Sequence, residues 1–95
     1  MKRHLTITNE PIKEVECVAG RELSGGMGAV VSFLGYVRNA ENESVISGLE
    51  YEAFQPMVEH QFQLLFDQIE ARWPIESVRL IHRIGVVRVN EPSLW

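Results

Sequence analysis

The chain has 95 residues, 45% of them hydrophobic and 23% charged, and its formal net charge is −4. This length and composition predict one soluble globular domain with a single core, over residues 1–95. No apolar run approaches the roughly 20 residues that cross a bilayer, the N-terminus has no signal-peptide pattern, and the acidic balance argues against general nucleic-acid binding.

The N-terminal part of the chain is predicted to form a strand and a helix. Residues 4–8 alternate in polarity, which favours a short strand. Asn9 is typical of a helix N-cap, an apolar stripe follows, and Gly20 ends a predicted helix of about ten residues. The single cysteine, Cys17, has no disulfide partner and fits a reducing cytosol, so we predict a cytoplasmic protein. No second ligand stands near Cys17 at metal-binding spacing, and we predict neither a metal nor a cofactor.

Residues 28–39 contain the most apolar part of the chain, after a glycine-rich connector at residues 20–28. Eight consecutive positions, from Ala29 to Tyr36, are apolar or small, and their β-branched and aromatic content predicts a strand in the middle of a sheet. Arg38 ends this run. A guanidinium held at the rim of a sheet suits phosphate or carboxylate groups, whereas a surface arginine that closes a hairpin is the simpler interpretation.

A second hairpin strand and a long helix are predicted next. Residues 45–54 pair with the preceding strand and expose the alternate acids Glu50 and Glu52, which we interpret as solvated rather than catalytic. Pro56 is favoured in the first turn of a helix, and Pro74 ends that helix. Its apolar stripe predicts core packing and consists of Val58, Phe62, Leu65, Phe66, Ile69 and Trp73.

The C-terminal part predicts strands at residues 77–84 and 86–89, a turn over residues 90–93, and the start of a further apolar strand. His82 lies on an apolar strand face, which is typical of a core histidine rather than a catalytic base. Four arginines and a single acid lie within residues 72–88. This pattern fits either the binding of an anionic molecule or acidic partner, or a pair of solvated strand faces.

Taken in order, these segments resemble the large, catalytic subunit of molybdopterin synthase, the MoaE family. The resemblance rests on Gly-Ala-Val-Val-Ser-Phe-Leu-Gly-Tyr-Val-Arg-Asn, Leu-Glu-Tyr-Glu-Ala-Phe, Arg-Trp-Pro, Ile-His-Arg-Ile-Gly and the later Asn-Glu-Pro-Ser. It implies an α+β fold of the α/β-hammerhead type, with two helices and a mostly antiparallel sheet. It covers nearly all of this chain but only about the first two-thirds of a typical member, so we expect a C-terminally incomplete domain.

The resemblance also implies an activity, partners and site residues. In this family a homodimeric large subunit receives the tail of a small ubiquitin-like subunit as a thiocarboxylate, and sulfur passes to cyclic pyranopterin monophosphate. The family's substrate-contacting Gly-x-Val-Arg segment falls on Tyr36, Val37 and Arg38, and Arg83 is a further candidate ligand or interface residue. The family's lysines that meet the thiocarboxylate lie beyond Trp95, so the resemblance assigns no catalytic residue within this chain.

Three interpretations stay open at this point. The chain is a molybdopterin synthase large subunit or a fragment of one, a catalytically inactive dimerising or binding module of the same fold, or an unrelated α+β domain. Its two lysines, Lys2 and Lys13, match no family lysine, which favours an inactive module for these residues alone. The ordered set of motifs counts against the unrelated domain. A strand edge without a partner promotes self-association, so we expect a dimer or a larger assembly.

Overall fold

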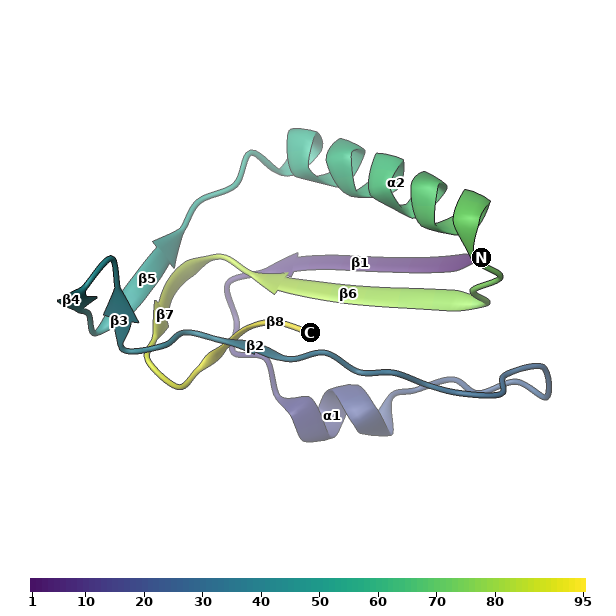
Figure 1. The fold of residues 1–95 in the computed structure, drawn as a ribbon, viewed down its shortest axis with the longest axis horizontal. Helices are drawn as coiled ribbons and strands as arrows, with labels where there is room; N and C mark the ends of the chain where they lie inside the picture. The colour runs from purple at the N-terminus through teal and green to yellow at the C-terminus, as the bar shows by residue number, and fades with distance from the viewer.

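The computed structural model describes residues 1–95, which form two helices and three small sheets (Figure 1). The elements are β1 (Lys2–Thr8), α1 (Glu14–Ala19), β2 (Gly35–Tyr36), β3 (Ala40–Glu41), β4 (Ser44–Val45), β5 (Gly48–Tyr51), α2 (Gln55–Arg72), β6 (Ser77–Arg83), β7 (Gly85–Arg88) and β8 (Pro92–Leu94). The main sheet has the order β1-β6-β8-β2, and two ribbons pair β3 with β4 and β5 with β7. Only the β1–β6 pair is parallel, which confirms the predicted α+β class with a mostly antiparallel sheet.

Helix α2 lies along one face of the main sheet, and α1 lies on the other face (Figure 1). The register of β1 and β6 sets Arg3 beside Val78 and His4 beside Arg79. Arg3 contacts α2, whereas the Arg79 guanidinium reaches the carbonyl oxygen of Cys17 in α1 at 3.5 Å. Because side chains alternate across a strand, every second residue of β6 faces α2 and the others face α1.

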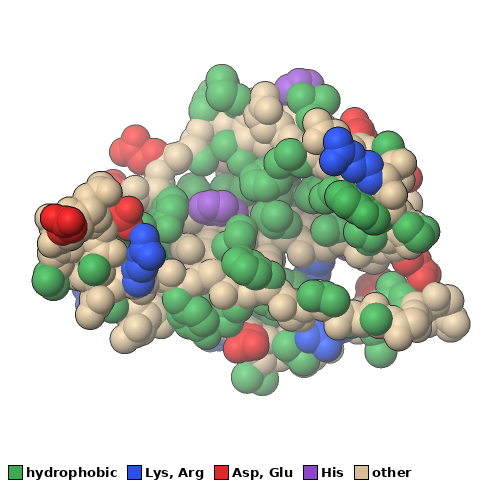
Figure 2. All heavy atoms as spheres, viewed as in Figure 1, with side chains coloured by type: hydrophobic (Ala, Val, Ile, Leu, Met, Phe, Trp, Pro, Cys, Tyr) green, Lys and Arg blue, Asp and Glu red, His purple; other side chains and the backbone are tan.

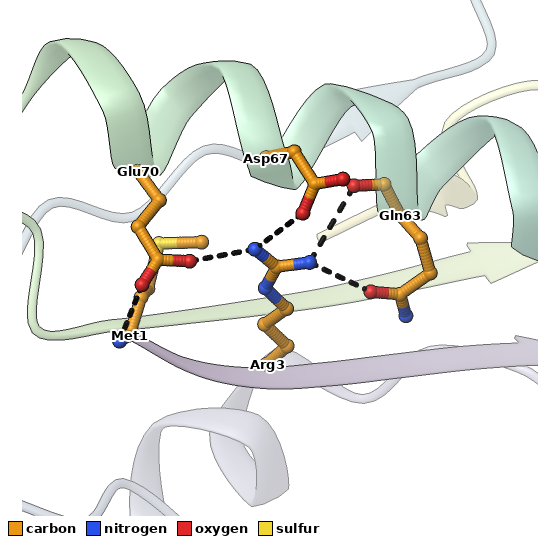
Figure 3. A network of polar contacts seen from close by, with 5 residues as sticks. All are labelled: Met1, Arg3, Gln63, Asp67 and Glu70. Atoms are coloured by element: carbon orange, nitrogen blue, oxygen red, sulfur yellow. Dashed lines mark hydrogen bonds and ion pairs between the residues drawn. The ribbon is translucent and has the colours of Figure 1, made fainter.

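One arginine connects β1 to three turns of α2 (Figure 3). Nη2 of Arg3 lies 2.6 Å from Oε2 of Glu70 and 2.8 Å from Oδ1 of Asp67. Nη1 donates to Oε1 of Gln63 at 3.0 Å. The N-terminal ammonium of Met1 lies 3.2 Å from the second carboxylate oxygen of Glu70. The guanidinium therefore fixes the position of α2 along β1.

Helix α1 is shorter than predicted and starts later. It begins at Glu14 after an extended Lys13, with φ −106° and ψ 104°, and Gly20 follows its last residue as expected. The prediction that Asn9 caps the helix is wrong. The hydroxyl of Thr8 instead accepts a hydrogen bond from the Glu10 backbone N–H at 3.1 Å, which forms a turn at the end of β1.

The apolar run at residues 29–36 is not the central strand that its composition predicts. Only Gly35 and Tyr36 form a strand, β2, and this strand is the last in the sheet. The side chains ahead of it are open to solvent, with Val31 92% exposed. The physical reason is the register. Gly35 lies opposite Leu94, so residues 29–33 extend past the end of β8 and have no backbone beside them to pair with.

The buried core is small. Five apolar side chains are buried, and they come from several elements: Ile12, Cys17, Val37, Phe66 and Val87. The predicted stripe of α2 is helical, but the prediction that all of it packs in the core is wrong, because only Phe66 is buried and Trp73 is 54% exposed. Since α2 follows the edge strand β1, the sheet covers only part of the stripe. Neither helix combines the length and the apolarity needed to cross a bilayer.

Gly48 is required by the close approach of β5 and β7. A Cβ at this position would lie 2.7 Å from the carbonyl oxygen of Val87, so Gly48→Ala must push the two strands apart. We expect this substitution to lower the free energy of unfolding by about 1–3 kcal/mol in urea denaturation. Gly28→Ala is the matched control, because apart from its chain neighbours no atom lies within 4 Å of its added Cβ. Equal losses in the two variants would contradict the prediction.

The Arg3 network predicts a dependence of stability on pH. The hydrogen bond from Arg3, and then the one from the N-terminal ammonium, hold the pKa of Glu70 below its ordinary value of 4.5. A carboxylate whose pKa is lowered by folding stabilises the fold above the unfolded pKa, and this stabilisation is lost as the pH falls through the folded pKa. We therefore expect Glu70→Gln to lower Tm at pH 7 and to lower it much less near pH 3. A Tm difference that is equal at both pH values would contradict this assignment.

Candidate functional site

The Gly35–Arg38 segment, predicted from the family resemblance to contact substrate, crosses from β2 into the loop before β3. Within this segment Val37 is buried, with only 2% of its surface exposed. The backbone of Val37 is fixed in both directions. Its N–H donates to the carbonyl oxygen of Glu91 at 3.1 Å, and its carbonyl oxygen accepts from the N–H of Asn90 at 2.9 Å. The segment therefore has a rigid backbone immediately before Arg38.

Arg83 holds the turn to which Val37 is bound. Its Nη1 lies 2.6 Å from Oε2 of Glu91, and its Nη2 donates to the carbonyl oxygen of Val86 at 3.4 Å. The Arg83 side chain is only 11% exposed, and its Nε has no partner. Asn90 completes the turn in the left-handed conformation, with φ 67°, which asparagine tolerates better than most residues. The contacts of Arg83 position the 90–91 turn and leave little of its guanidinium open to a ligand.

Arg38 and Tyr36 point away from the core. They stand on either side of the buried Val37, so in an extended chain they share the outer face. The Arg38 side chain is 79% exposed, and Tyr36 is 56% exposed. The one ion pair of Arg38 is with Glu41, at 3.8 Å. A pair that long and that exposed contributes little stability, so Glu41 leaves the guanidinium open to another anion.

Arg38 lines neither of two cavities on this molecule. One cavity, of about 510 Å³, lies over the β5–β7 ribbon. Its lining residues are Ser47, Gly48, Leu49, Glu50, Val86 and Arg88. The other, of about 880 Å³, lies between β6 and the loop at residues 20–31. Tyr36, Val37 and Arg83 are also absent from both linings. Tyr36 and Arg38 therefore form an exposed rim outside these two cavities, whereas Val37 and Arg83 are buried.

The other candidate residues from the sequence are His82 and the arginines within residues 72–88. Nδ1 of His82 lies 2.8 Å from the carbonyl oxygen of Arg83, and its ring meets Tyr51 edge to face at 5.4 Å, which confirms a packed histidine. The arginines within residues 72–88 do not form one patch. Arg79 faces α1, Arg83 is paired with Glu91, and Arg88 is on β7. No group of three or more His, Cys, Asp or Glu side chains is arranged to hold a metal ion.

Sequence reasoning missed Glu91, which both pairs with Arg83 and holds the backbone of Val37. The only sequence signal was an acid inside the predicted turn at residues 90–93, shortly after a predicted strand that contains Arg83. Removing its charge by Glu91→Gln leaves the Arg83 guanidinium without its charge partner, and we expect a loss of about 1–3 kcal/mol in unfolding free energy.

Glu41→Gln is the matched control for Glu91→Gln, because Glu41 pairs with an exposed arginine at the longer distance of 3.8 Å. We expect this control to change the unfolding free energy by less than about 0.5 kcal/mol. Urea denaturation of both variants measures the difference. An effect of Glu41→Gln as large as that of Glu91→Gln would contradict the role given to the Arg83–Glu91 pair.

Comparison with known proteins relates the chain to one family. The family described as MoaE protein matches residues 7–95. The molybdopterin synthase catalytic subunit of Homo sapiens is 41% identical over 68 residues, which cover 70% of this chain and 36% of that protein. The subunit of the same name from Staphylococcus carnosus (strain TM300) is 35% identical over 89 residues, which cover 94% of this chain and 59% of the relative. The chain thus spans about one-third to three-fifths of the lengths of these relatives.

The fold is similar to a solved structure. The molybdopterin biosynthesis MoaE protein from Burkholderia ambifaria MC40-6 superposes with a TM-score of 0.78 and 23% sequence identity. The superposition covers 99% of this chain and 60% of that protein. At this identity the likeness concerns the fold, and it supports the arrangement of strands and helices described above.

Proposed function

The chain belongs to the MoaE protein family, and from this we propose that it acts in molybdenum cofactor biosynthesis as the large subunit of molybdopterin synthase. The proposed reaction transfers sulfur from the thiocarboxylate of a small ubiquitin-like subunit to cyclic pyranopterin monophosphate. The observation that carries the proposal is the family match over residues 7–95, together with relatives named molybdopterin synthase catalytic subunit. The relatives are longer than this chain, so the activity is proposed from the part of their sequences that this chain matches.

We propose Arg38 as the group that contacts the phosphate of the pterin. Its planar guanidinium is suited to paired hydrogen bonds with two phosphate oxygens. Within the chain its only ionic partner is Glu41, at 3.8 Å. Val37 contributes through its fixed backbone, since its side chain is buried. Tyr36 lies on the same outer face, where its ring and hydroxyl are open to the substrate. Arg83 acts through Glu91 by positioning this segment.

The second candidate function is a module of the same fold that dimerises or binds without turnover. Sulfur transfer needs a positioned cation to stabilise the anionic intermediate. The only lysines of the chain, Lys2 in β1 and Lys13 before α1, are outside the 35–38 segment and follow no family lysine motif. This observation favours binding without turnover for the 95 residues acting alone.

The proposed partners are the small subunit, the pterin and a second copy of this chain, in the cytoplasm. Support for a protein partner comes from apolar side chains that are open to solvent before β2, with Val31 92% and Phe33 69% exposed. Apolar patches of this kind are typical of protein contact surfaces. The single free cysteine fits a reducing compartment.

Arg38→Ala tests the site. We expect the dissociation constant for cyclic pyranopterin monophosphate, measured by calorimetry, to rise at least about tenfold, because a charge-assisted contact to phosphate is lost. Arg72→Ala is the matched control, since this exposed arginine ends α2 far along the chain from the 35–38 segment, and its affinity should stay within about twofold. Affinity unchanged in Arg38→Ala would reject the role of this residue.

An activity assay separates the two candidate functions, the synthase and the binding module. The chain is mixed with thiocarboxylated small subunit and pyranopterin, and dithiolene formation is measured. Product formed at a rate that Arg38→Ala lowers supports the synthase. Pterin binding without product supports the binding module, and the absence of both binding and product rejects the proposed function.

A further inference from the structure

Arg38, on the exposed rim, is followed three residues later by an acid that a hairpin holds beside it. The carboxylate of this acid, Glu41, lies 3.8 Å from Nη2 of Arg38. Figure 2 shows acidic side chains at the end of the molecule where Figure 1 places β3 and β4, with a basic side chain next to them. An anion that approaches the Arg38 guanidinium therefore meets a negative charge already at its side.

The backbone is fixed on both sides of Arg38. Before it, Val37 is hydrogen-bonded in both directions to residues 90 and 91. After it, the carbonyl oxygen of Asn39 accepts a hydrogen bond from the N–H of Ile46 at 3.0 Å, which closes the base of the β3–β4 hairpin. The arginine thus starts from a fixed point, and the hairpin that carries its acidic neighbour starts from the next residue.

The β3–β4 hairpin is tight, and it restricts the position of Glu41. Strand β3, which consists of Ala40 and Glu41, pairs with β4 along its whole length. The two turn residues, Asn42 and Glu43, have φ values of 48° and 66°, in the left-handed region that two-residue hairpin turns use. The Glu41 side chain is 43% exposed, compared with 79% for Arg38. Neighbouring atoms therefore cover more than half of Glu41 and keep its carboxylate near the guanidinium.

The ion pair between Arg38 and Glu41 adds little to the stability of the fold, because it is long and exposed. Its carboxylate nevertheless acts on any anion that Arg38 binds. At about 4 Å in water, the repulsion between two unit charges weakens binding by roughly three- to fivefold, and the factor applies once for each charge on the ligand. A ligand with two negative charges therefore loses more affinity than a ligand with one.

Cyclic and open phosphate esters differ in the number of charges they carry. A phosphate that is closed into a ring by two ester bonds has one acidic oxygen left and carries one negative charge. A phosphomonoester has a second pKa of about 6 and carries about 1.5 to 2 negative charges at pH 7. A carboxylate beside the phosphate-binding group therefore weakens the binding of the monoester more than the binding of the cyclic ester.

We propose that Glu41 sets the charge selectivity at Arg38, so that a singly charged cyclic phosphate is favoured over a doubly charged phosphomonoester. Selectivity is a difference of affinities, and a group that repels the wrong ligand produces it as well as a group that attracts the right one. This role of Glu41 rests on the proposed function, in which Arg38 contacts the phosphate of the pterin. Groups outside this chain that also touch the ligand act alike on the wild type and on a Glu41 variant, so a comparison of the two isolates Glu41.

The test compares two ligands that share one pterin: cyclic pyranopterin monophosphate and the monoester that hydrolysis of its cyclic phosphate produces. Calorimetry at about pH 7.5 in low salt gives the dissociation constant of the monoester divided by that of the cyclic ligand. We expect Glu41→Gln to lower this ratio about three- to fivefold, because the neutral amide no longer repels the additional charge of the monoester. The cyclic ligand itself should bind this variant more tightly by a similar factor.

Two further variants control this comparison. Glu59→Gln removes the same charge from an exposed acid of α2, away from the β3–β4 hairpin (Figure 1), and its ratio should stay within about 1.5-fold of the wild-type ratio. Glu41→Lys places a positive charge where the carboxylate stood, so we expect the ratio to fall by about a further three- to fivefold. Equal ratios in Glu41→Gln and Glu41→Lys would show that charge is not the cause and would overturn the role of Glu41.

The same measurements on Arg38→Ala separate the selectivity role of Glu41 from the proposed function. An unchanged or increased ratio in Glu41→Gln, while Arg38→Ala still weakens the binding of both ligands, overturns the role of Glu41 and leaves the phosphate contact of Arg38 intact. Affinities that Arg38→Ala leaves unchanged remove that phosphate contact, and the role of Glu41 is rejected with it. A wild-type chain that binds neither ligand rejects both.

Discussion

The pairing of β6 is unequal on its two sides, and most of the structure depends on this constraint. Toward β1 it is paired along its whole length, from Ser77 to Arg83. Toward β8 it is paired only near its C-terminal end, around Ile81 and His82. The fully paired side gives β1, and through Arg3 also α2, a fixed place. The partly paired side leaves backbone edges free beside the large cavity.

The rim at residues 35–38 depends on the same strand through a chain of short-range contacts. Arg83 is the last residue of β6, its ion pair fixes Glu91, and the backbone of Glu91 fixes Val37. An arginine on a rigid backbone loses less conformational entropy on binding an anion than one on a mobile loop. The buried Arg83 thus fixes the backbone next to the exposed Arg38. The two arginines therefore have different physical roles.

Local patterns in the sequence were sufficient for the elements whose contacts are local or repeat regularly. The alternation of β1 and β6 and the stripe of α2 each gave the right element type within a few residues. The run at 29–36 failed because a strand needs a neighbouring backbone, and apolar composition does not supply one. The contacts of Arg3 with α2 and of Arg83 with Glu91 depend on tertiary geometry. No spacing rule along the chain indicates them, whereas the predicted role of residues 36–38 came from the family resemblance.

The parallel pairing of β1 with β6 also affects the order of folding. β1 emerges first during synthesis, and its only partner in the sheet emerges after both helices and most of the other strands. Contacts between distant parts of a chain form slowly, because the entropy of closing a long loop is lost before the contact stabilises it. The first strand therefore stays without its partner until residues 77–83 have left the ribosome, and during that interval it is exposed to chaperones and to aggregation.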